Sequence, residues 1–175
     1  MKENMSAKIK EFPGEEVKLA DLKAGKVPAI RDRSRAKYVF SAGIAMSKFL
    51  NELKKGRILA STCNKCGRIM VPPRMFCEQC FKPTDGWTYV KDTGTINTYS
   101  VPFVAGDASR LKEPIIAIVV DLDGASPGMG ILHTMKEVDW KKVKFGMKVK
   151  AVWKPEKERT GAITDIKYFK PLKEE

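Results

Sequence analysis

The chain has 175 residues, of which 33 are Lys or Arg and 21 are Asp or Glu, giving a net charge of +12. Hydrophobic residues make up 43% of it, so a packed core is expected in one ordinary domain or in two small ones. The longest uncharged apolar run, 114–120, is too short to span a membrane, and residues 1–10 lack the apolar segment of a secretion signal. We therefore expect a cytoplasmic protein without a membrane partner.

The basic excess lies mainly in the first third of the chain. Residues 1–60 contain 14 basic and 7 acidic residues, residues 61–86 contain 4 and 2, and residues 87–175 contain 15 and 12. Such an excess attracts nucleic acid, an anionic cofactor such as CoA, or an acidic partner protein. It is equally typical of a lysine-rich solvated surface, a composition that is also found in heat-adapted proteins.

Residues 1–37 form a basic N-terminal arm. Proline and glycine interrupt this segment repeatedly and no hydrophobic period is sustained, so we predict only one short helix, near 17–23. Three alternating arginines close the arm: Arg31, Arg33 and Arg35. Arginines at this spacing either hold phosphates or carboxylates or belong to a solvated segment.

Residues 38–57 contain the best helix of the sequence, predicted over 41–55. Its apolar side chains have the i, i+3, i+4, i+7 spacing of one helical face: Met46, Phe49, Leu50 and Leu53. Ser41 is the expected N-cap and Gly56 the expected stop. The apolar face either packs on the protein's own core, which we favour, or docks a partner protein or an acyl chain. We call this segment the docking helix.

All four cysteines lie in the next segment, 58–87, as Cys63-x2-Cys66-x10-Cys77-x2-Cys80. Two CxxC pairs in short turns bring four thiolates onto one tetrahedral ion, so the segment is predicted to be a structural zinc ribbon. Gly67 suits the left-handed backbone that such a turn needs after its second cysteine. Iron in a rubredoxin-like site is the alternative to zinc.

Other roles for these cysteines fit the sequence less well. A disulfide framework belongs to secreted chains, and a thioredoxin-like motif needs one reactive CxxC beside a βαβ pattern. With all four thiolates on the metal, no position is left for water or substrate. We therefore expect no cysteine nucleophile.

Residues 88–175 have an all-β pattern. Strands are predicted over 88–102 (with a turn at 92–94), 114–122, 129–135, 147–153 and 162–169, and a short helical turn near 138–143. Five strands with this late insertion indicate a small closed barrel of the OB-fold type. An SH3-like barrel or an open sandwich is the alternative.

The sequence offers no set of catalytic residues. The only histidine, His133, lies in a predicted strand, and Asp121 and Asp123 precede a glycine where turn formation accounts for them. No phosphate-binding glycine loop and no nucleophile elbow occur. We therefore expect that the protein is not an enzyme, and a stand-alone acyltransferase or hydrolase is the least favoured class.

In chain order, the sequence has a helix, CxxCG (63–67), PPR (72–74), CxxC (77–80), Trp87 and GTINTYSV (94–101). This order resembles the rubredoxin-like zinc-ribbon plus OB-fold family, long described as a domain of unknown function, whose members accompany acyl-CoA thiolases. The resemblance spans residues 41–170 and leaves out the arm. It implies a mainly β fold with an N-terminal helix, a zinc ribbon and a five-stranded OB-fold barrel.

The resemblance further implies an accessory role in acyl-CoA metabolism. In archaea, such a protein resembles the scaffold that bridges acetoacetyl-CoA thiolase and 3-hydroxy-3-methylglutaryl-CoA synthase in the mevalonate route to isoprenoids, and helps to enclose the shared CoA thioester. Where CoA is contacted, Arg68 and Arg74 are candidates for its phosphates, because guanidinium groups suit phosphate oxygens. Exposed ribbon charges and partner contacts are the alternative roles for both.

A nucleic-acid-binding module is the competing function, because zinc ribbons and OB-folds both occur in such proteins. Bases would then stack on exposed aromatic side chains, for which the candidates are Tyr89, Tyr99, Phe103 and Trp153. The small net charge of the barrel segment argues against this function, and the same rings serve equally as core residues.

Overall fold

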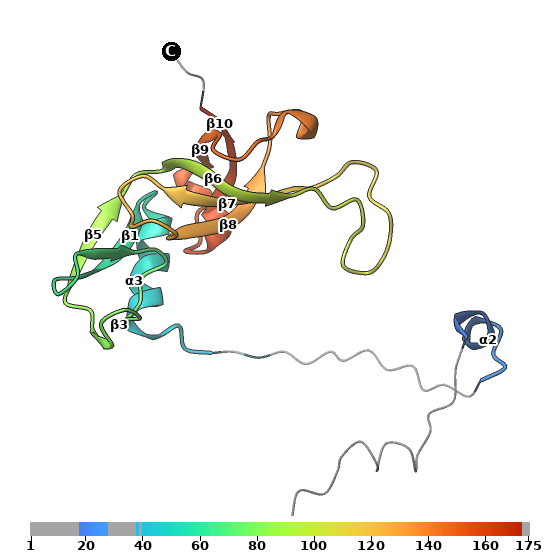
Figure 1. The fold of residues 1–175 in the computed structure, drawn as a ribbon, viewed down its shortest axis with the longest axis horizontal. Helices are drawn as coiled ribbons and strands as arrows, with labels where there is room; N and C mark the ends of the chain where they lie inside the picture. The colour runs from blue at the N-terminus through green and yellow to red at the C-terminus, as the bar shows by residue number, and fades with distance from the viewer. Residues whose placement is uncertain (1–17, 28–37, 39, 173–175) are drawn as a thin grey trace, which may run out of the picture. The chain divides into compact units, whose positions relative to one another are not determined.

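The computed structural model describes residues 18–27, 38 and 40–172, and it divides the chain into two units, Met1–Phe40 and Ser41–Glu175. In the first unit the predicted short helix is present as α2, Leu19–Lys23 (Figure 1). The arginine triplet of the arm lies outside the described residues. No helix of the described residues is long and apolar enough to cross a membrane.

The second unit begins with helix α3, Gly43–Lys54. Ser41 is not the N-cap: that position is Ala42, which has no side-chain cap hydrogen bond, and the Ser41 hydroxyl accepts from the Gly43 N–H at 3.3 Å, before the first turn. Gly56, with a φ of +75°, follows the helix as predicted. Phe49 is 1% exposed and lies in the main core, so the apolar face packs on the protein itself.

The zinc-ribbon segment forms two small antiparallel sheets. One has the order β2-β1-β5 and the other is the pair β3-β4. Their strands are β1 Ile58–Cys63, β2 Arg68–Met70, β3 Phe76–Cys77, β4 Lys82–Pro83 and β5 Gly86–Val90. The predicted turn at 92–94 is wrong in its bounds: the break between the two sheets lies at 91–92, and Thr93 and Gly94 already belong to barrel strand β6. Before the break, β5 pairs with β1 of the ribbon from Ile58↔Val90 to Thr62↔Gly86.

The remaining strands close into a barrel with the order β10-β8-β7-β6-β9. They are β6 Thr93–Ser100, β7 Ile116–Leu122, β8 Gly130–Met135, β9 Lys148–Trp153 and β10 Ile166–Pro171. The predicted helical turn between the third and fourth barrel strands is the 3-10 helix η1, Trp140–Lys142. A closed five-stranded barrel after a ribbon confirms the predicted fold class.

One hydrophobic core runs through α3, β1 and the barrel interior. Its largest fully buried side chains include Phe49, Leu53, Ile58, Ile118, Ile166 and Phe169. Two glycines let the barrel strands approach β7: a Cβ at Gly94 would lie 2.3 Å from the Asp121 carbonyl oxygen, and one at Gly130 would lie 2.4 Å from that of Val120. Both positions therefore exclude a side chain.

The connection between β9 and β10 fastens the barrel to α3. It contains the 3-10 helices η2, Glu156–Glu158, and η3, Ile163–Asp165, where a continuous strand was predicted from Ala162. The buried Asp165 carboxylate accepts hydrogen bonds from three successive backbone N–H groups, those of Thr160, Gly161 and Ala162. A Cβ at Gly161 would lie only 3.3 Å from the carbonyl oxygen of Leu50 in α3.

Candidate metal centre

Two turns of the same design present the four cysteines. In the first, the backbone N–H of Gly67 donates to the Cys63 carbonyl, and in the second the N–H of Phe81 donates to the Cys77 carbonyl, both at 2.8 Å. Each donor residue is left-handed, with φ of +71° at Gly67 and +50° at Phe81. Sequence reasoning identified Gly67 only, although the CxxC spacing places Phe81 at the equivalent position.

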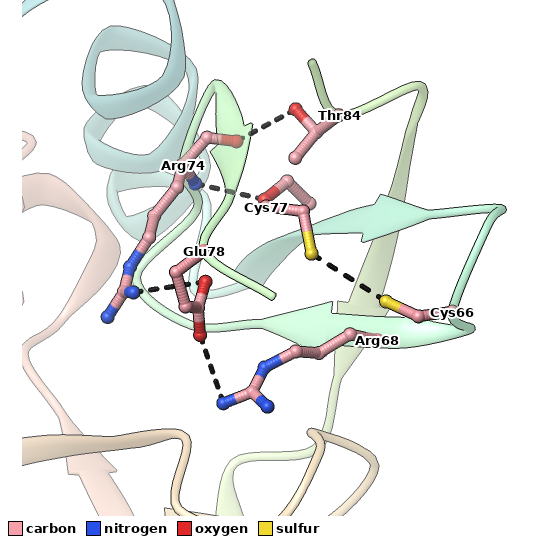
Figure 2. A network of polar contacts seen from close by, with 7 residues as sticks. Cys66, Arg68, Arg74, Cys77, Glu78 and Thr84 are labelled. Atoms are coloured by element: carbon pink, nitrogen blue, oxygen red, sulfur yellow. Dashed lines mark hydrogen bonds and ion pairs between the residues drawn. The ribbon is translucent and has the colours of Figure 1, made fainter. Parts of the chain in front are cut away.

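The four sulfur atoms converge as one tetrahedral ion requires. The Sγ atoms of Cys63, Cys66, Cys77 and Cys80 all lie within 4.8 Å of one another, and Cys66 Sγ is 3.6 Å from Cys77 Sγ (Figure 2). Metal–sulfur bonds of about 2.3 Å place tetrahedral thiolates about 3.8 Å apart, whereas a disulfide needs about 2.05 Å. The donors thus fit a closed four-thiolate site, the only cluster of metal-ligating side chains among the described residues.

The protein's own hydrogen bonds prepare these thiols unequally for a metal. The pKa of Cys77 is lowered to about 7 because the backbone N–H groups of Cys80 and Gln79 donate to its sulfur. The pKa of Cys80 is raised to about 12 by its hydrogen bond with Cys66 and by burial. Metal binding would therefore have to displace protons, since only thiolates are ligands.

Glu78, between the two cysteines of the second turn, holds both arginines that we proposed for CoA (Figure 2). Its carboxylate lies 3.0 Å from Arg68 Nη2 and 3.2 Å from Arg74 Nη1. The Arg68 side chain is 18% exposed and that of Arg74 is 48% exposed. A phosphate at this place would compete with Glu78, and the CoA role of the two arginines stays a prediction.

Arg74 is also fixed through its backbone. Its N–H donates to Ser61 Oγ at 2.9 Å, and its carbonyl accepts from Thr84 Oγ1 at 2.8 Å. Arg68 Nε is buried without a partner, the only such side-chain atom in the described part of the chain. The two guanidinium groups are thus held beside the metal ligands and oriented by Glu78.

A clasp joins the ribbon to the barrel behind the metal site. Ile69 in β2 donates its N–H to Ser126 Oγ at 2.9 Å, and its carbonyl accepts from the Ser126 N–H at 3.0 Å. Met129, from the same barrel loop, packs with Met70 and two of the cysteines in a small separate core. No local signal in the sequence pairs residues 57 positions apart, so sequence reasoning missed this clasp.

The residues weighed for catalysis are engaged elsewhere in the fold. The Thr134 N–H donates to His133 Nδ1 at 2.8 Å, and the imidazole ring meets Phe169 edge-on at 5.7 Å. Asn97 donates to Asp121 at 2.8 Å, and Thr93 Oγ1 donates to Asp123 at 2.6 Å. That hydrogen bond from Thr93 lowers the pKa of Asp123, with help from Lys148. The structure brings none of these side chains to the metal centre.

The aromatic side chains weighed for base stacking come from four separate segments and each has an internal contact. Tyr99 packs on Phe145 with ring centroids 5.0 Å apart, and Phe103 packs edge-on against Trp140 at 5.5 Å. Trp153 Nε1 donates to Asp92, while the Tyr89 hydroxyl donates to Glu52. They form no single row of free ring faces.

Comparison with known proteins agrees with this architecture. The family profile of the ChsH2 rubredoxin-like zinc ribbon domain matches residues 50–85, and that of the ChsH2 C-terminal OB-fold domain matches residues 87–154. No curated protein matches the chain.

Two solved structures have the same fold. A crystal structure of a DUF35-family protein of unknown function from Sulfolobus solfataricus is 31% identical, with a TM-score of 0.54; the match covers 63% of this chain and 78% of that one. The structure of the Ltp2-ChsH2(DUF35) aldolase is 17% identical, with a TM-score of 0.52, and the match covers 79% and 98% of the two chains. From its ribbon, its barrel and this identity, the chain belongs to the DUF35 family.

Proposed function

We propose that this protein is a non-catalytic accessory subunit of acyl-CoA metabolism. In this role it bridges acetoacetyl-CoA thiolase and 3-hydroxy-3-methylglutaryl-CoA synthase, or related thiolase-type enzymes, in the mevalonate route. The observation that carries the proposal is the union of a ChsH2-type ribbon and a ChsH2-type OB-fold in one chain. The similar fold of the Ltp2-ChsH2(DUF35) aldolase supports a partner enzyme.

The chemistry of the metal centre supports a structural role. Four thiolates complete the coordination of a zinc ion, whose contribution is to fold the ribbon, and they leave no position for a reacting group. The imidazole of His133 is held by the backbone and a core ring. A scaffold acts by confinement instead: an intermediate released beside the second active site is rebound at a raised effective concentration.

The proposal is tested by co-expressing the full chain with the thiolase and the synthase of its own organism. We expect the three proteins to co-elute in size-exclusion chromatography, and the chain alone to leave acetoacetyl-CoA unchanged. Separate elution of all three would refute the bridging role. Turnover by the chain alone would refute the non-catalytic one.

The CoA contact is tested in the same complex. Replacing Arg68 and Arg74 by Gln should weaken CoA binding measured by calorimetry, whereas Glu78→Gln, which releases both guanidinium groups from their carboxylate, should not weaken it. Unchanged CoA binding in the double variant would remove these arginines from the proposal. Zinc content is measured in parallel, because Glu78 lies between two metal ligands.

A further inference from the structure

A groove lies between the polar side of α3 and the strands β1 and β5. Its volume is about 410 Å³, and it is lined by Lys48, Asn51, Glu52, Lys55, Leu59, Trp87 and Tyr89. Lys48, Glu52 and Lys55 are spaced i, i+4, i+7 and therefore share one face of the helix. Trp87 and Tyr89 alternate along β5 and share one face of the ribbon sheet. We call this surface the basic–aromatic groove.

Both rings of the groove are accessible and each has a cation above it. Trp87 is 37% exposed and Tyr89 is 52% exposed. Lys48 Nζ lies 4.5 Å from the centroid of the Trp87 ring, and the Arg57 guanidinium lies 4.8 Å from that of Tyr89. Tryptophan, tyrosine and arginine are the residues that contribute most binding energy at protein interfaces.

The one carboxylate of the groove is already saturated. Glu52 accepts from Lys55 Nζ at 2.8 Å and from the Tyr89 hydroxyl at 3.0 Å, and it also pairs with Arg57. The hydrogen bond from Lys55 is the main reason that the pKa of Glu52 is lowered. Within the described residues, no carboxylate pairs with Lys48, so the groove presents one ammonium that contacts only the Trp87 ring, and a net positive charge.

We propose that the basic–aromatic groove binds an acidic segment of a partner protein, with a carboxylate on Lys48 and an apolar side chain against Trp87. Charge complementarity selects this occupant: an ammonium without a carboxylate partner, beside two exposed rings, suits a carboxylate next to an apolar residue. A nucleic acid strand is disfavoured because its row of phosphates needs several free cations. The proposal rests on the accessory function, for which it names a docking surface.

The first test needs no partner enzyme. The full chain has three tryptophans, whose indole N–H signals separate in an NMR spectrum and are assigned with single Trp→Phe variants. The probe is a hexapeptide of alternating Glu and Leu, compared at low salt with the same peptide carrying Gln for Glu. We expect only the acidic peptide to shift the indole N–H signal of Trp87, with the signals of Trp140 and Trp153 unchanged. Equal shifts by both peptides, or none, would overturn the proposal.

The second test measures affinity for the thiolase and the synthase by surface plasmon resonance. Lys48→Glu should weaken binding of one of them by about tenfold or more, and this loss should shrink as salt is raised. Lys142→Glu, an exposed lysine of η1 without an ion pair in the described residues, is the control with the same charge change. Trp87→Leu should weaken binding at every salt concentration, because it removes the ring.

The outcomes separate this inference from the accessory function. If both enzymes bind the chain, and Lys48→Glu binds them as tightly as Lys142→Glu does, the proposed docking site in the groove is refuted and the accessory function stands. If neither enzyme binds but the acidic peptide still shifts Trp87, the accessory function fails and the groove stands. The proposal of an acidic partner would be overturned if the chain bound a labelled oligo-dT strand with nanomolar affinity and Lys48→Glu abolished that binding. Unchanged zinc content and melting temperature show that each variant is folded.

Discussion

The barrel and the tip of the ribbon are stabilised in different ways. The barrel has five strands of six to eight residues and a core of large aliphatic and aromatic side chains. The ribbon tip has strands of two and three residues, and its separate core consists of Cys63, Met70, Cys77 and Met129. So small a cluster cannot offset the conformational entropy of its chain without a cross-link, so we expect a bound metal to complete the tip's core.

The largest difference between the stabilities of the two regions is expected when one metal ligand is removed. Cys63→Ser should abolish stoichiometric zinc binding, since structural sites contribute about 10–16 kcal/mol to folding in small zinc peptides. Hydrogen exchange should then rise across 64–85 while β6–β10 stay protected. Equal loss of protection in the barrel would show that the two regions fold as one unit.

The next largest effect is expected in the barrel core. Phe169 is 0% exposed, so Phe169→Ala should destabilise the protein by about 3–5 kcal/mol, with Phe169→Leu as a milder control. Denaturant unfolding followed by circular dichroism measures the difference. If metal binding does not depend on the barrel core, Phe169→Ala should bind zinc with the affinity of the unmodified chain, measured at denaturant concentrations below its unfolding transition. A loss of zinc affinity in Phe169→Ala would contradict the separate stabilisation of barrel and ribbon tip.

A smaller effect is expected where the barrel meets α3. Burial raises the pKa of Asp165, but the three backbone N–H donors outweigh it and the pKa is lowered overall. A carboxyl whose folded pKa lies below its unfolded value stabilises the protein above the unfolded pKa, and this contribution is lost as the pH falls through the folded pKa. Asp165→Asn should therefore cost about 1–3 kcal/mol at pH 7.

The pH dependence checks the cause of that cost. The difference in unfolding free energy between the unmodified chain and Asp165→Asn should shrink as the pH is lowered from 7 toward 3, because both chains then lack the charge. Exposed Asp139→Asn is the comparison variant. A difference that is the same at both pH values would assign the effect to packing instead.

The smallest effect is expected in the second cysteine turn of the ribbon. Phe81 is left-handed and 82% exposed, so Phe81→Gly should relieve about 1 kcal/mol of backbone strain without removing a core side chain. We expect tighter zinc retention against a chelator, with Gly67→Ala as the opposite substitution at the equivalent position. Weaker retention in Phe81→Gly would show that the ring itself stabilises the turn.

The sequence alone predicted features that depend on local spacing. The two CxxC pairs predicted the four-cysteine site and the role of Gly67. The i, i+3, i+4, i+7 spacing of apolar side chains predicted the buried face of α3. The assignment of β5 to the ribbon sheet was missed, because an alternating pattern does not say which strand is the neighbour. The Asp165 site was missed because three donors to one carboxylate leave no sequence motif.

The groove was also beyond local reasoning. Lys48 and Trp87 are 39 positions apart and come together only through the pairing of β1 with β5 and the packing of α3 on β1. The sequence indicated that α3 is apolar on one side, and the structure shows that this side is used internally. The polar side of the same helix lines the groove for which we propose an acidic partner.

The clasp between Ile69 and Ser126 has a geometric consequence for a bridging protein. The N–H and the carbonyl of Ile69 both bond to Ser126, and Met129 of the same barrel loop packs with Met70, so hydrogen bonds and packing together hold the ribbon against the barrel. Two enzymes held on these two parts would keep one mutual angle, and the path between their active sites would have one length. Spin labels on the ribbon and on the barrel would record this as a single narrow distance distribution.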